Sequence, residues 1–249
     1  MDPRLSIIEE RLKDVKRVIA VAGGKGGIGK SSVSATLAIV LARAGHRVGL
    51  LDLDICGPST HVILGIKGVY PTEDKGIVPP LVHGIRFMSI IYYAGDNPSP
   101  IRGADISNLI IELLTITRWG SLDFLVIDMP PGIGDPTLDV IRFMKRVEFL
   151  VVTTPSKVAI ETVRKLVKML AELGIPITGL VENMKMPSSL GIGQSLEPLG
   201  VPLLGGIAFD EGLEQAVGDV EKLAESCFAQ ELTAALRRII DERGGESHV

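Results

Sequence analysis

The stretch AVAGGKGGIGKSS (20–32) decides the fold class of this chain. It holds Gly24, four further residues, and then Gly29, Lys30 and a serine, which is the spacing of the Walker A motif. The apolar segment RVIAVA (17–22) leads into it, and a segment rich in alanine, leucine and valine follows. A strand, a glycine-rich loop and a helix in this order are the context that the motif requires. The sequence therefore predicts a phosphate-binding loop.

Each residue type in the loop has a chemical reason. Glycines let backbone N–H groups point at phosphate oxygens, Lys30 neutralises the β and γ phosphates, and Ser31 offers a hydroxyl to magnesium. The predicted nucleotide contacts of the loop are Gly24, Lys25, Gly26, Gly27, Ile28, Gly29, Lys30, Ser31 and Ser32. Lys25 is a second lysine that the motif does not need. The alternative interpretation of Lys25 is a surface lysine on a loop. The alternative interpretation of the whole stretch is a glycine-rich turn without a ligand.

Seven short apolar segments are strand candidates, and helical patterns separate several of them. They are 17–22, 47–54, 85–91, 123–129, 148–154, 177–183 and 202–209. Continuous apolar strands that alternate with helices indicate a parallel sheet covered on both faces. We therefore expect an α/β, doubly wound, mostly parallel sheet of about seven strands. No internal repeat or low-complexity linker interrupts the chain, so we expect a single domain over 1–249.

Acidic residues follow two of these apolar strands. FLVIDMPPG (124–132) ends in Asp128 and a Pro-Pro-Gly turn, whose Gly132 N–H is placed to sense the γ-phosphate. VGLLDLD (48–54) supplies Asp52 and Asp54, which face one side of an extended strand because side chains alternate along it. These carboxylates are candidates for holding magnesium and the attacking water. The alternative for Asp52 and Asp54 is a strand-end cap or a solvated turn.

Composition narrows the class of partner and the compartment. The net charge of −4 comes from 26 basic and 30 acidic residues without a long block of either sign, so we expect no nucleic acid partner. Two cysteines cannot make a disulfide framework, and the charged N-terminus lacks the apolar core of a signal peptide. No apolar run approaches the roughly 20 residues that cross a bilayer. These features predict a cytoplasmic protein.

The two ends of the chain show helical patterns. Residues 1–16 are predicted as an amphipathic helix, with an apolar stripe of Leu5, Ile8, Leu12 and Val15. The stripe packs on the protein's own sheet or, alternatively, docks into a partner. Residues 211–249 are predicted as C-terminal helices and a tail. Their apolar face is read as a helix on the core, without stable membrane association.

Several motifs occur in an order that resembles the deviant Walker A ATPases of the MinD and Mrp type. They are KGGIGKSS, DLDICGPS, VIDMPPGIGD, VTTPS and VENM, and the resemblance covers nearly the whole chain. The resemblance implies a magnesium-dependent ATPase switch that forms a homodimer around ATP. It implies that Lys25 crosses the interface to the partner's nucleotide and that Asp54 positions the hydrolytic water. It also implies that Asp52 and Asp128 lie around magnesium with Ser31.

The same resemblance addresses the base. It implies that Asn183 lies against the base and that Phe209 and Asp210 border the base pocket. Guanine-specific relatives usually carry an Asn-Lys-x-Asp motif, whereas this chain has ENMKM (182–186), without the acidic residue. We therefore expect adenine. Ala208 stands where the group often has proline.

The positions of the cysteines decide which process the sequence predicts this ATPase switch to serve. CGPST and MPPGIGD resemble the Mrp iron-sulfur carriers most, and those usually place a Cys-x-x-Cys pair after ENM to bind a cluster. This chain has VENMKMPSSLGIGQS (181–195) there, and no cysteine lies between Cys56 and Cys227. This absence favours a resemblance to archaeal Mrp/MinD-type HypB, which implies nickel insertion in [NiFe] hydrogenase maturation. A HypA-type nickel metallochaperone would be the partner, and the hydrogenase large subunit the indirect client.

Two alternatives for the output stay open. The first is an iron–sulfur cluster carrier or assembly ATPase, and the second is a MinD/ParA-like positioning ATPase on membrane or DNA. Cys56 and His61 form a possible transition-metal pair, because thiolate and imidazole suit nickel or zinc and a dimer would double them. Their alternative reading is a small buried cysteine and a surface histidine. We expect Ni²⁺ to arrive through the partner.

Overall fold

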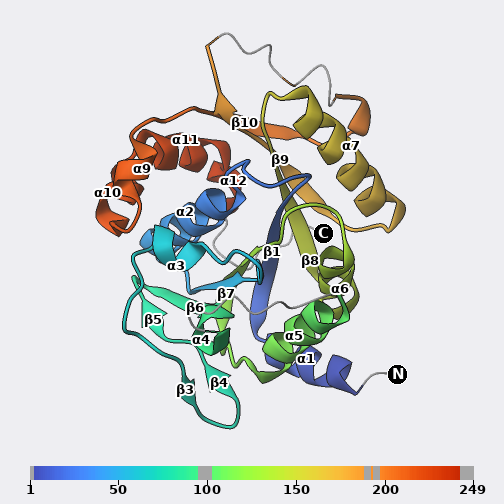
Figure 1. The fold of residues 1–249 in the computed structure, drawn as a ribbon, viewed down its shortest axis with the longest axis vertical. Coiled ribbons are helices and arrows are strands. Elements are labelled where there is room, and N and C mark those ends of the chain that lie inside the picture. Colours follow the sequence, from blue (N-terminus) through green and yellow to red (C-terminus); the bar gives the residue numbers. More distant parts are fainter. Residues whose placement is uncertain (1–2, 95–102, 188–191, 193–196, 242–249) are drawn as a thin grey trace.

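The computed structural model describes residues 3–94, 103–187, 192 and 197–241. Its centre is an eight-stranded sheet with the order β10-β9-β8-β1-β7-β2-β6-β5 (Figure 1). The strands are β1 (Val15–Gly23), β2 (Val48–Asp52), β5 (Leu81–Val82), β6 (Ile85–Ser89), β7 (Leu122–Asp128), β8 (Val147–Thr153), β9 (Ile177–Lys185) and β10 (Leu203–Ala208). Every neighbouring pair is parallel except β5 and β6. The predicted α/β, mostly parallel sheet is confirmed, with β5 as an additional antiparallel edge strand.

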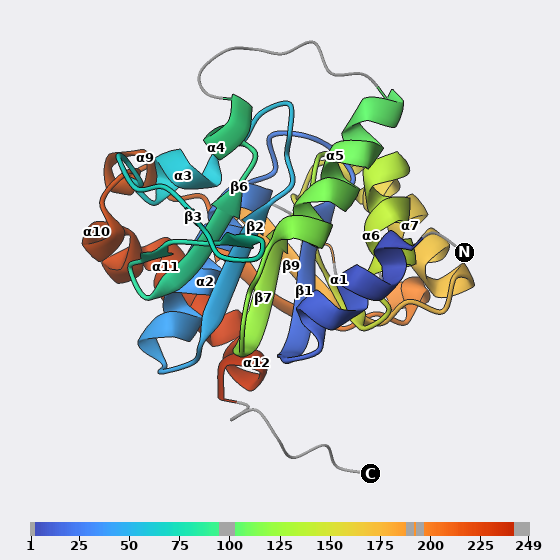
Figure 2. The same ribbon diagram turned by 90° about the horizontal axis from the view of Figure 1, so that it is seen from below.

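Helices cover both faces of the sheet (Figures 1 and 2). One face carries α1 (Arg4–Leu12), α5 (Gly103–Ile116), α6 (Asp135–Phe143) and α7 (Lys157–Glu172). The other carries α2 (Lys30–Arg43), α3 (Thr60–Ile63), α9 (Leu213–Ala216), α10 (Val220–Glu225), α11 (Cys227–Ala235) and α12 (Arg237–Asp241). A hydrophobic core lies on each face of the sheet, and the central strand β1 contributes to both. Its Val18 and Ala20 face one core, and its Ile19 and Val21 face the other. Its continuous apolar sequence follows from burial on both faces.

Smaller elements complete the described chain. A separate two-stranded sheet pairs β3 (Thr72–Glu73) with β4 (Ile77–Val78) in antiparallel fashion. A short helix α4 (Ile91–Ala94) follows β6, and a 3₁₀ turn η1 (Glu197–Leu199) precedes β10. The β3–β4 pair and β5 fall within residues 67–100, a stretch of the sequence that is rich in glycine and proline.

The N-terminal helix is shorter than the predicted 1–16. Helix α1 ends at Leu12, and Val15 already belongs to β1, where it pairs with Leu122 of β7. Sheet pairing therefore removes Val15 from the helical stripe. Ile8 and Leu12 are buried, and Arg146 Nη2 donates to the Leu12 carbonyl at 3.0 Å. The stripe packs on the protein's own core, where α1 contacts α5 and α6.

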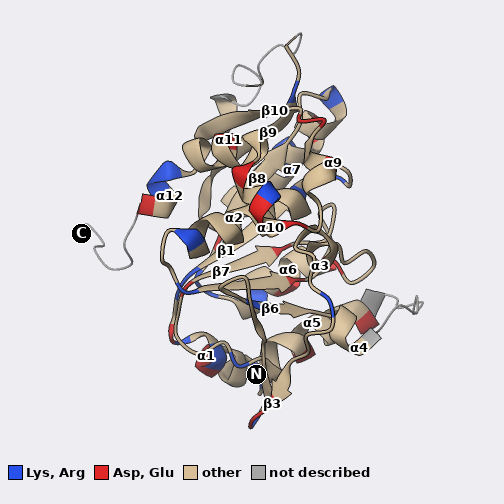
Figure 3. Ribbon diagram, turned by 90° about the vertical axis from the view of Figure 1, so that its left-hand side faces the viewer, with Lys and Arg blue, Asp and Glu red and all other residues tan. Residues whose placement is uncertain are grey.

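The C-terminal helices pack their apolar face inward. Leu232, Leu236, Ile239 and Ile240 are all buried on the α2 side of the sheet. The His46 ring Nε2 lies 2.8 Å from the Ile240 carbonyl, which ties α12 to the α2–β2 turn. On this side basic and acidic residues are interspersed (Figure 3). Residues 242–249, the end of the predicted segment of helices and tail over 211–249, lie outside the described residues.

None of the described helices combines the length and the apolar character that crossing a membrane requires.

Candidate nucleotide site

Three parallel strands end together beside the glycine-rich loop. Asp128, the last residue of β7, is in register with Val21 of β1 and with Asp52, the last residue of β2. The loop follows β1, and α2 begins at Lys30 after Gly29, whose φ of +82° is left-handed. Because register partners in a parallel sheet point to the same face, the two carboxylates lie next to each other. The fold thus brings the loop and both aspartates of the predicted magnesium site to one edge of the sheet.

The Asp128 carboxylate is buried and only half satisfied. Ser34 Oγ donates to its Oδ1 at 2.9 Å, and Ser31 and Lys30 are its other near neighbours. Its Oδ2 is buried and has no hydrogen-bond partner in the described part of the chain. Lys30 is itself 6% exposed, so a cation and a carboxylate share a nearly dry site. A buried acceptor without a partner is costly unless a ligand satisfies it.

Asp52 is held by the segment that follows its own strand. Its Oδ1 accepts from the Asp54 N–H at 3.0 Å. Its Oδ2 accepts from the Thr60 N–H at 3.2 Å and from the Thr60 hydroxyl at 2.6 Å. These bonds fold residues 52–60 back over the strand end and start α3 at Thr60. The loop between β2 and α3 is therefore attached directly to the carboxylate that faces the phosphate loop.

The pKa values of the two carboxylates rise together. Burial, and next the charge of Asp128, raise the pKa of Asp52 to about 7. Burial also raises the pKa of Asp128, although Lys30 and the hydroxyls of Ser31 and Ser34 oppose the shift. Two buried carboxyl groups side by side cannot both ionise cheaply. The pair is electrostatically suited to a cation or to a ligand that brings one.

Lys25 and Asp54 lie at the open side of the site. Lys25 is half-buried, and its side chain forms no ion pair or hydrogen bond with the residues that the structure describes. Asp54 is also half-buried, and its Oδ1 accepts from the Gly57 N–H at 3.2 Å. Neither side chain is therefore committed to a structural ion pair. Their predicted roles, in the partner's site and on the attacking water, stay predictions.

Two glycines of the loop are required by packing as well as by phosphate. A Cβ added at Gly24 would lie 2.2 Å from Oγ1 of Thr162, on α7, and 2.7 Å from its backbone carbon. A Cβ at Gly29 would lie 2.2 Å from Asn183 Nδ2. At Gly26, in contrast, the nearest atom would be 3.8 Å away. The two ends of the loop are pressed against α7 and β9, whereas its middle is open.

Asn183 and Gly132 make bonds that the sequence did not predict. Asn183 is buried on β9, and its Nδ2 donates to the Ile28 carbonyl at 2.9 Å. This hydrogen bond ties the phosphate loop to β9. The Gly132 N–H donates to the Gly23 carbonyl at 3.3 Å. That N–H would have to leave Gly23 before it could bind a phosphate. The predicted contacts of these residues with base and γ-phosphate stay predictions.

Phe209 and Asp210 follow β10. The Phe209 side chain is 50% exposed, so its ring is available to stack on a base. Both oxygens of Asp210 are used on backbone amides, Oδ1 by Gly212 at 2.9 Å and Oδ2 by Phe228 at 3.4 Å. Asp210 thus holds the turn into α9 and the start of α11. Its predicted place at the base pocket is not tested.

The predicted transition-metal pair is not extended by other ligands. Cys56 is exposed in the β2–α3 loop, and the His61 side chain lines a separate cavity beside α3. Among the described residues, no group of three or more His, Cys, Asp or Glu side chains could hold a metal ion. Within one chain, Cys56 and His61 therefore remain at most two ligands.

Three supporting residues were missed by the sequence analysis. They are Ser34, which bonds Asp128; Thr60, which bonds Asp52; and Thr162, which packs on Gly24. Ser34 could have been found, because it lies four residues after Lys30 and so on the same face of the helix. Thr60 and Thr162 have no comparable spacing signal, since they reach the site only through the fold.

Comparison with known proteins decides the family. The model of the ParA family described as "NUBPL iron-transfer P-loop NTPase" matches residues 14–242, which include every element of the site. The chain belongs to this ParA-type P-loop NTPase family. The predicted fold and nucleotide-binding class are thereby confirmed at the level of the family.

Two curated relatives illustrate the similarity. The "iron-sulfur cluster carrier protein" of Pseudomonas fragi is 46% identical over 70% of this chain and 62% of its own length. The protein of the same name from Methanocaldococcus jannaschii is 34% identical over 96% of this chain and 89% of its own length. The chain thus spans less than two thirds of the bacterial relative. Both relatives carry the iron–sulfur name and neither carries the HypB name, so the predicted closeness to HypB is not supported.

A solved structure shows the same architecture. The nucleotide-binding protein from Archaeoglobus fulgidus, determined in complex with ADP and with Co found in it, superposes with a TM-score of 0.78 at 30% identity. The match covers 91% of this chain and 96% of that one. The overall fold is therefore similar to that of a protein determined in complex with ADP.

Proposed function

We propose that this protein is a magnesium-dependent ATPase that forms a homodimer around ATP and acts as a switch in metal-centre assembly. The observation that carries the proposal is the buried Asp52–Asp128 pair beside Lys30, with Asp128 Oδ2 unpartnered among the described residues. A triphosphate with its cation would satisfy that oxygen, the lysine and the loop amides together. Membership of a P-loop NTPase family supports the same conclusion.

The residues at the strand ends fit Mg²⁺. Ser31, Asp52 and Asp128 would hold the ion, since they offer the hard oxygen ligands that Mg²⁺ prefers alongside phosphate and water. When bound, Mg²⁺ supplies positive charge for the phosphate oxygens. Ser34 and Thr60 orient the two carboxylates through the hydrogen bonds described above. Because the carboxyl groups resist ionising together, their full charge develops only when a cation is near.

Other residues have separate proposed roles. Lys30 and the amides of 24–32 would bind the phosphates, while Lys25 would reach the nucleotide of the partner subunit. Asp54 would orient the attacking water, supported by its position two residues after Asp52 and by its bond from Gly57. Asn183, Phe209 and Asp210 would form the adenine side. If Gly132 leaves Gly23 for the γ-phosphate, the turn after β7 would report whether ATP or ADP is bound.

Iron–sulfur cluster carriage is the first candidate for the output. The names of the relatives support it. The chain has two cysteines, Cys56 and Cys227, and both are exposed, so a homodimer would offer four thiolates. Cys56 lies in the loop attached to Asp52, where a bound metal group could respond to the nucleotide. Four thiolates are the usual set for an iron–sulfur cluster.

Anaerobic reconstitution tests this candidate. The purified protein is incubated with ferrous iron and sulfide, desalted, and assayed for iron, acid-labile sulfide and visible absorption, with and without MgATP. We expect stoichiometric iron and sulfide per dimer, lost in Cys56→Ser. Ser59→Ala, in the same loop but without a thiolate, is the matched control. Absence of stoichiometric iron and sulfide in the wild-type protein would contradict carriage while leaving the ATPase proposal standing.

Nickel delivery is the second candidate, and one observation favours it. The segment 181–195 has no cysteine, although iron–sulfur carriers of the resembling type usually place two after ENM. Under this candidate the client is a [NiFe] hydrogenase large subunit, and Ni²⁺ comes through a HypA-type partner. Isothermal titration with a purified HypA-type protein, with and without MgATP, tests it. No binding in either state would reject it.

A further inference from the structure

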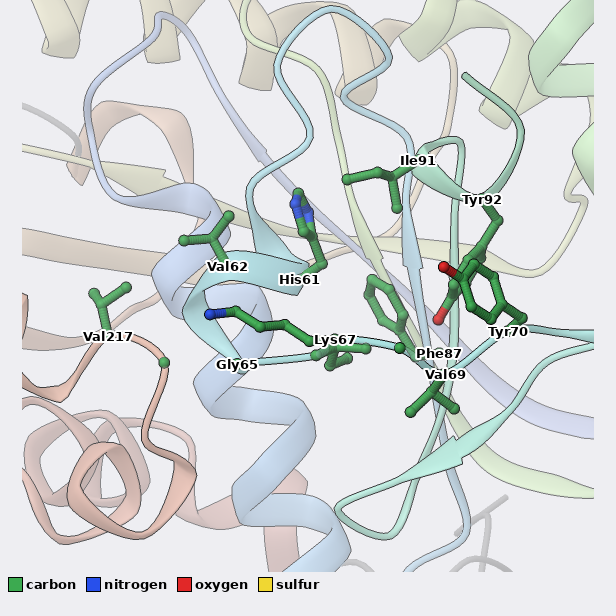
Figure 4. A pocket seen from close by; sticks show the side chains of 13 residues that line it. His61, Val62, Gly65, Lys67, Val69, Tyr70, Phe87, Ile91, Tyr92 and Val217 are labelled. Carbon is green, nitrogen blue, oxygen red and sulfur yellow. The ribbon is translucent and has the colours of Figure 1, made fainter. Parts of the chain in front are cut away.

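A cavity of about 730 Å³ opens beside α3, away from the predicted phosphate contacts (Figure 4). Its walls come from α3, from residues 65–70, from β6 and α4, and from the turn between α9 and α10. We call it the α3 pocket. Cavities of roughly 300–1,000 Å³ are the size that ligands and anchoring side chains occupy.

The α3 pocket has an aromatic side. Phe87 is fully buried at its floor and meets Tyr92 edge-to-face, with ring centroids 5.9 Å apart. The ring centroids of Tyr70 and Tyr92 are 6.3 Å apart, and Tyr70 is 70% exposed. The Tyr92 hydroxyl is buried without a hydrogen-bond partner in the described part of the chain. Burial raises its pKa to about 12, so it stays protonated and can donate to an occupant.

The opposite side combines aliphatic groups with a cation. Figure 4 shows Val62 and Val217 on the side of the cavity away from the aromatic rings, with the Lys67 side chain extending toward Val62. Val62 is 53% exposed, and Val69 at the rim is 37% exposed. The apolar surface therefore continues from the cavity onto the outside of the molecule, which is typical of a protein-binding surface rather than of a closed small-molecule site.

The charged residues that line the α3 pocket indicate which kind of partner segment it would bind. The described residues that line the pocket include Lys67 and His61 but neither aspartate nor glutamate, although the chain as a whole has a net charge of −4. Lys67 is exposed and forms no ion pair with any residue that the structure describes. An occupant with a carboxylate beside an apolar anchor would match the lysine and the aromatic floor together. A second copy of this acidic chain is a poorer match.

The wall of the pocket is connected to the nucleotide site. Thr60, the first residue of α3, bonds Asp52 Oδ2 through both its N–H and its hydroxyl, and His61 and Val62 follow it into the pocket. The other end of α3 is anchored, because the Gly218 N–H donates to the Ile63 carbonyl at 3.0 Å. A change at Asp52 would thus move the start of α3 against a fixed end. The shape of the pocket would change with it.

We propose that the α3 pocket docks a partner-protein segment that combines an apolar anchor side chain with an acidic residue, and that bound nucleotide regulates this docking. The anchor would lie against Phe87, Tyr70 and Tyr92, and the acidic residue would pair with Lys67. The docking stands on the pocket alone, whereas its regulation rests on the proposed ATPase function.

A random-peptide library displayed on phage tests the occupant. It is selected against the full chain with Mg²⁺ and a non-hydrolysable ATP analogue, and the consensus peptide is then measured by fluorescence anisotropy. We expect a consensus with an aromatic or aliphatic residue next to Asp or Glu. Tyr70→Ala and Lys67→Glu should each weaken it by about tenfold or more, and Lys67→Glu should accept the peptide with Lys in place of the acid.

Matched controls keep the test specific. Lys165→Glu and Leu173→Ala change an exposed lysine and an exposed leucine on and after α7, away from the pocket, and should leave the affinity unchanged. A basic or uncharged consensus, or no loss in the pocket variants, would overturn the docking proposal. So would sedimentation showing that Tyr70→Ala only breaks a self-association of the chain.

The nucleotide arm separates the two proposals. Peptide affinity is measured in the apo form, with MgADP and with the ATP analogue, and nucleotide binding is measured in parallel. We expect at least a severalfold difference between the nucleotide states, abolished in Thr60→Val. Equal affinities in a protein that binds nucleotide would overturn the regulation. A protein that binds the peptide but no nucleotide would overturn the ATPase function and leave the docking intact.

Discussion

Strand β7 carries an aspartate near each end, and their carboxylates have opposite pKa shifts. Asp123, near the start, accepts from Arg47 through backbone and side chain and lies 2.9 Å from Lys16 Nζ, and the bonds from Arg47 hold its pKa well below the usual range. Asp128, at the end, is buried beside Asp52, and burial raises its pKa. The described residues satisfy both oxygens of Asp123 but only one oxygen of Asp128.

The two ends of β7 therefore differ in role: the aspartate at one end supports the structure, and the aspartate at the other end is available to a ligand. At the amino end of β7, two cations and a backbone amide neutralise Asp123, so nothing further is needed there. At the carboxyl end, Lys30 faces a pair of carboxyl groups, and Asp128 Oδ2 is left without a partner among the described residues. Ligand sites of open α/β sheets lie at the carboxyl ends of the strands, where such unsatisfied groups can be met by phosphate and metal.

Removing a cation at one end of β7 or at the other gives the largest expected difference in nucleotide binding. Lys30→Ala should abolish nucleotide binding, because Lys30 is the lysine that the Walker A motif places on the β and γ phosphates. Arg47→Ala, which removes one of the two cations at Asp123, should leave binding unchanged. Isothermal titration with a non-hydrolysable ATP analogue measures both. Equal losses in the two variants would erase the functional contrast between the ends.

Lys25→Ala refines this prediction within the loop. We expect nucleotide binding to persist while the hydrolysis rate falls by about 10³-fold, as for a charge supplied across a dimer interface. A phosphate-release assay measures the rate. An unchanged rate and affinity, with Lys30→Ala inactive, would reject the role in the partner's site.

The pH dependence of stability should reflect the raised pKa of Asp52. The folded apo protein holds this proton up to about pH 7, whereas the unfolded chain releases it near pH 4, so raising the pH through this window should destabilise the folded state by about 4 kcal/mol. Asp52→Asn should flatten this part of the curve, and Asp105→Asn, at an exposed position on α5, should not. Urea unfolding at several pH values measures it, and identical curves for wild type and Asp52→Asn would contradict it.

The two ends of the phosphate loop differ in packing, which a pair of alanine variants can sharpen. Gly24→Ala should cost about 1–3 kcal/mol and weaken nucleotide binding, because the new Cβ meets the backbone of Thr162 on α7. Gly26→Ala has room and keeps a normal backbone, so its stability should change by less than about 1 kcal/mol. Thermal unfolding of the apo proteins distinguishes the two. Similar losses would mean that α7 does not restrain the loop.

The smallest expected effect concerns the satisfied end of β7. Asp123→Asn should destabilise the protein by about 1 kcal/mol near neutral pH, since its partners Arg47 and Lys16 are partly exposed. Its lowered pKa gives stability above about pH 4 that is lost as the pH falls through the folded pKa, so the variant and wild type should converge in acid. Nucleotide affinity should not change. A loss of affinity would mean that the two ends of the strand are coupled.

Much of the fold and phosphate site could be predicted from local patterns. The Walker A spacing, the apolar strands and the acidic residues at their ends all lie in short segments, and parallel strands must bring their carboxyl ends together. The helix over 1–16 was predicted too long because Val15 enters β1, where pairing with Leu122 outweighs helical spacing. The output was harder, because a missing cysteine pair pointed to HypB while the relatives are named iron–sulfur carriers.

The sequence by itself determined a phosphate loop at Lys30, the apolar strand segments of a mostly parallel sheet, and the acidic positions Asp52 and Asp128. The tertiary structure alone decided that these carboxylates are buried side by side, that Thr60 connects one of them to α3, and that a pocket with Lys67 lies beyond. The physical reason is that spacing along the chain specifies local conformation, whereas burial, charge neighbours and cavities arise where distant segments meet.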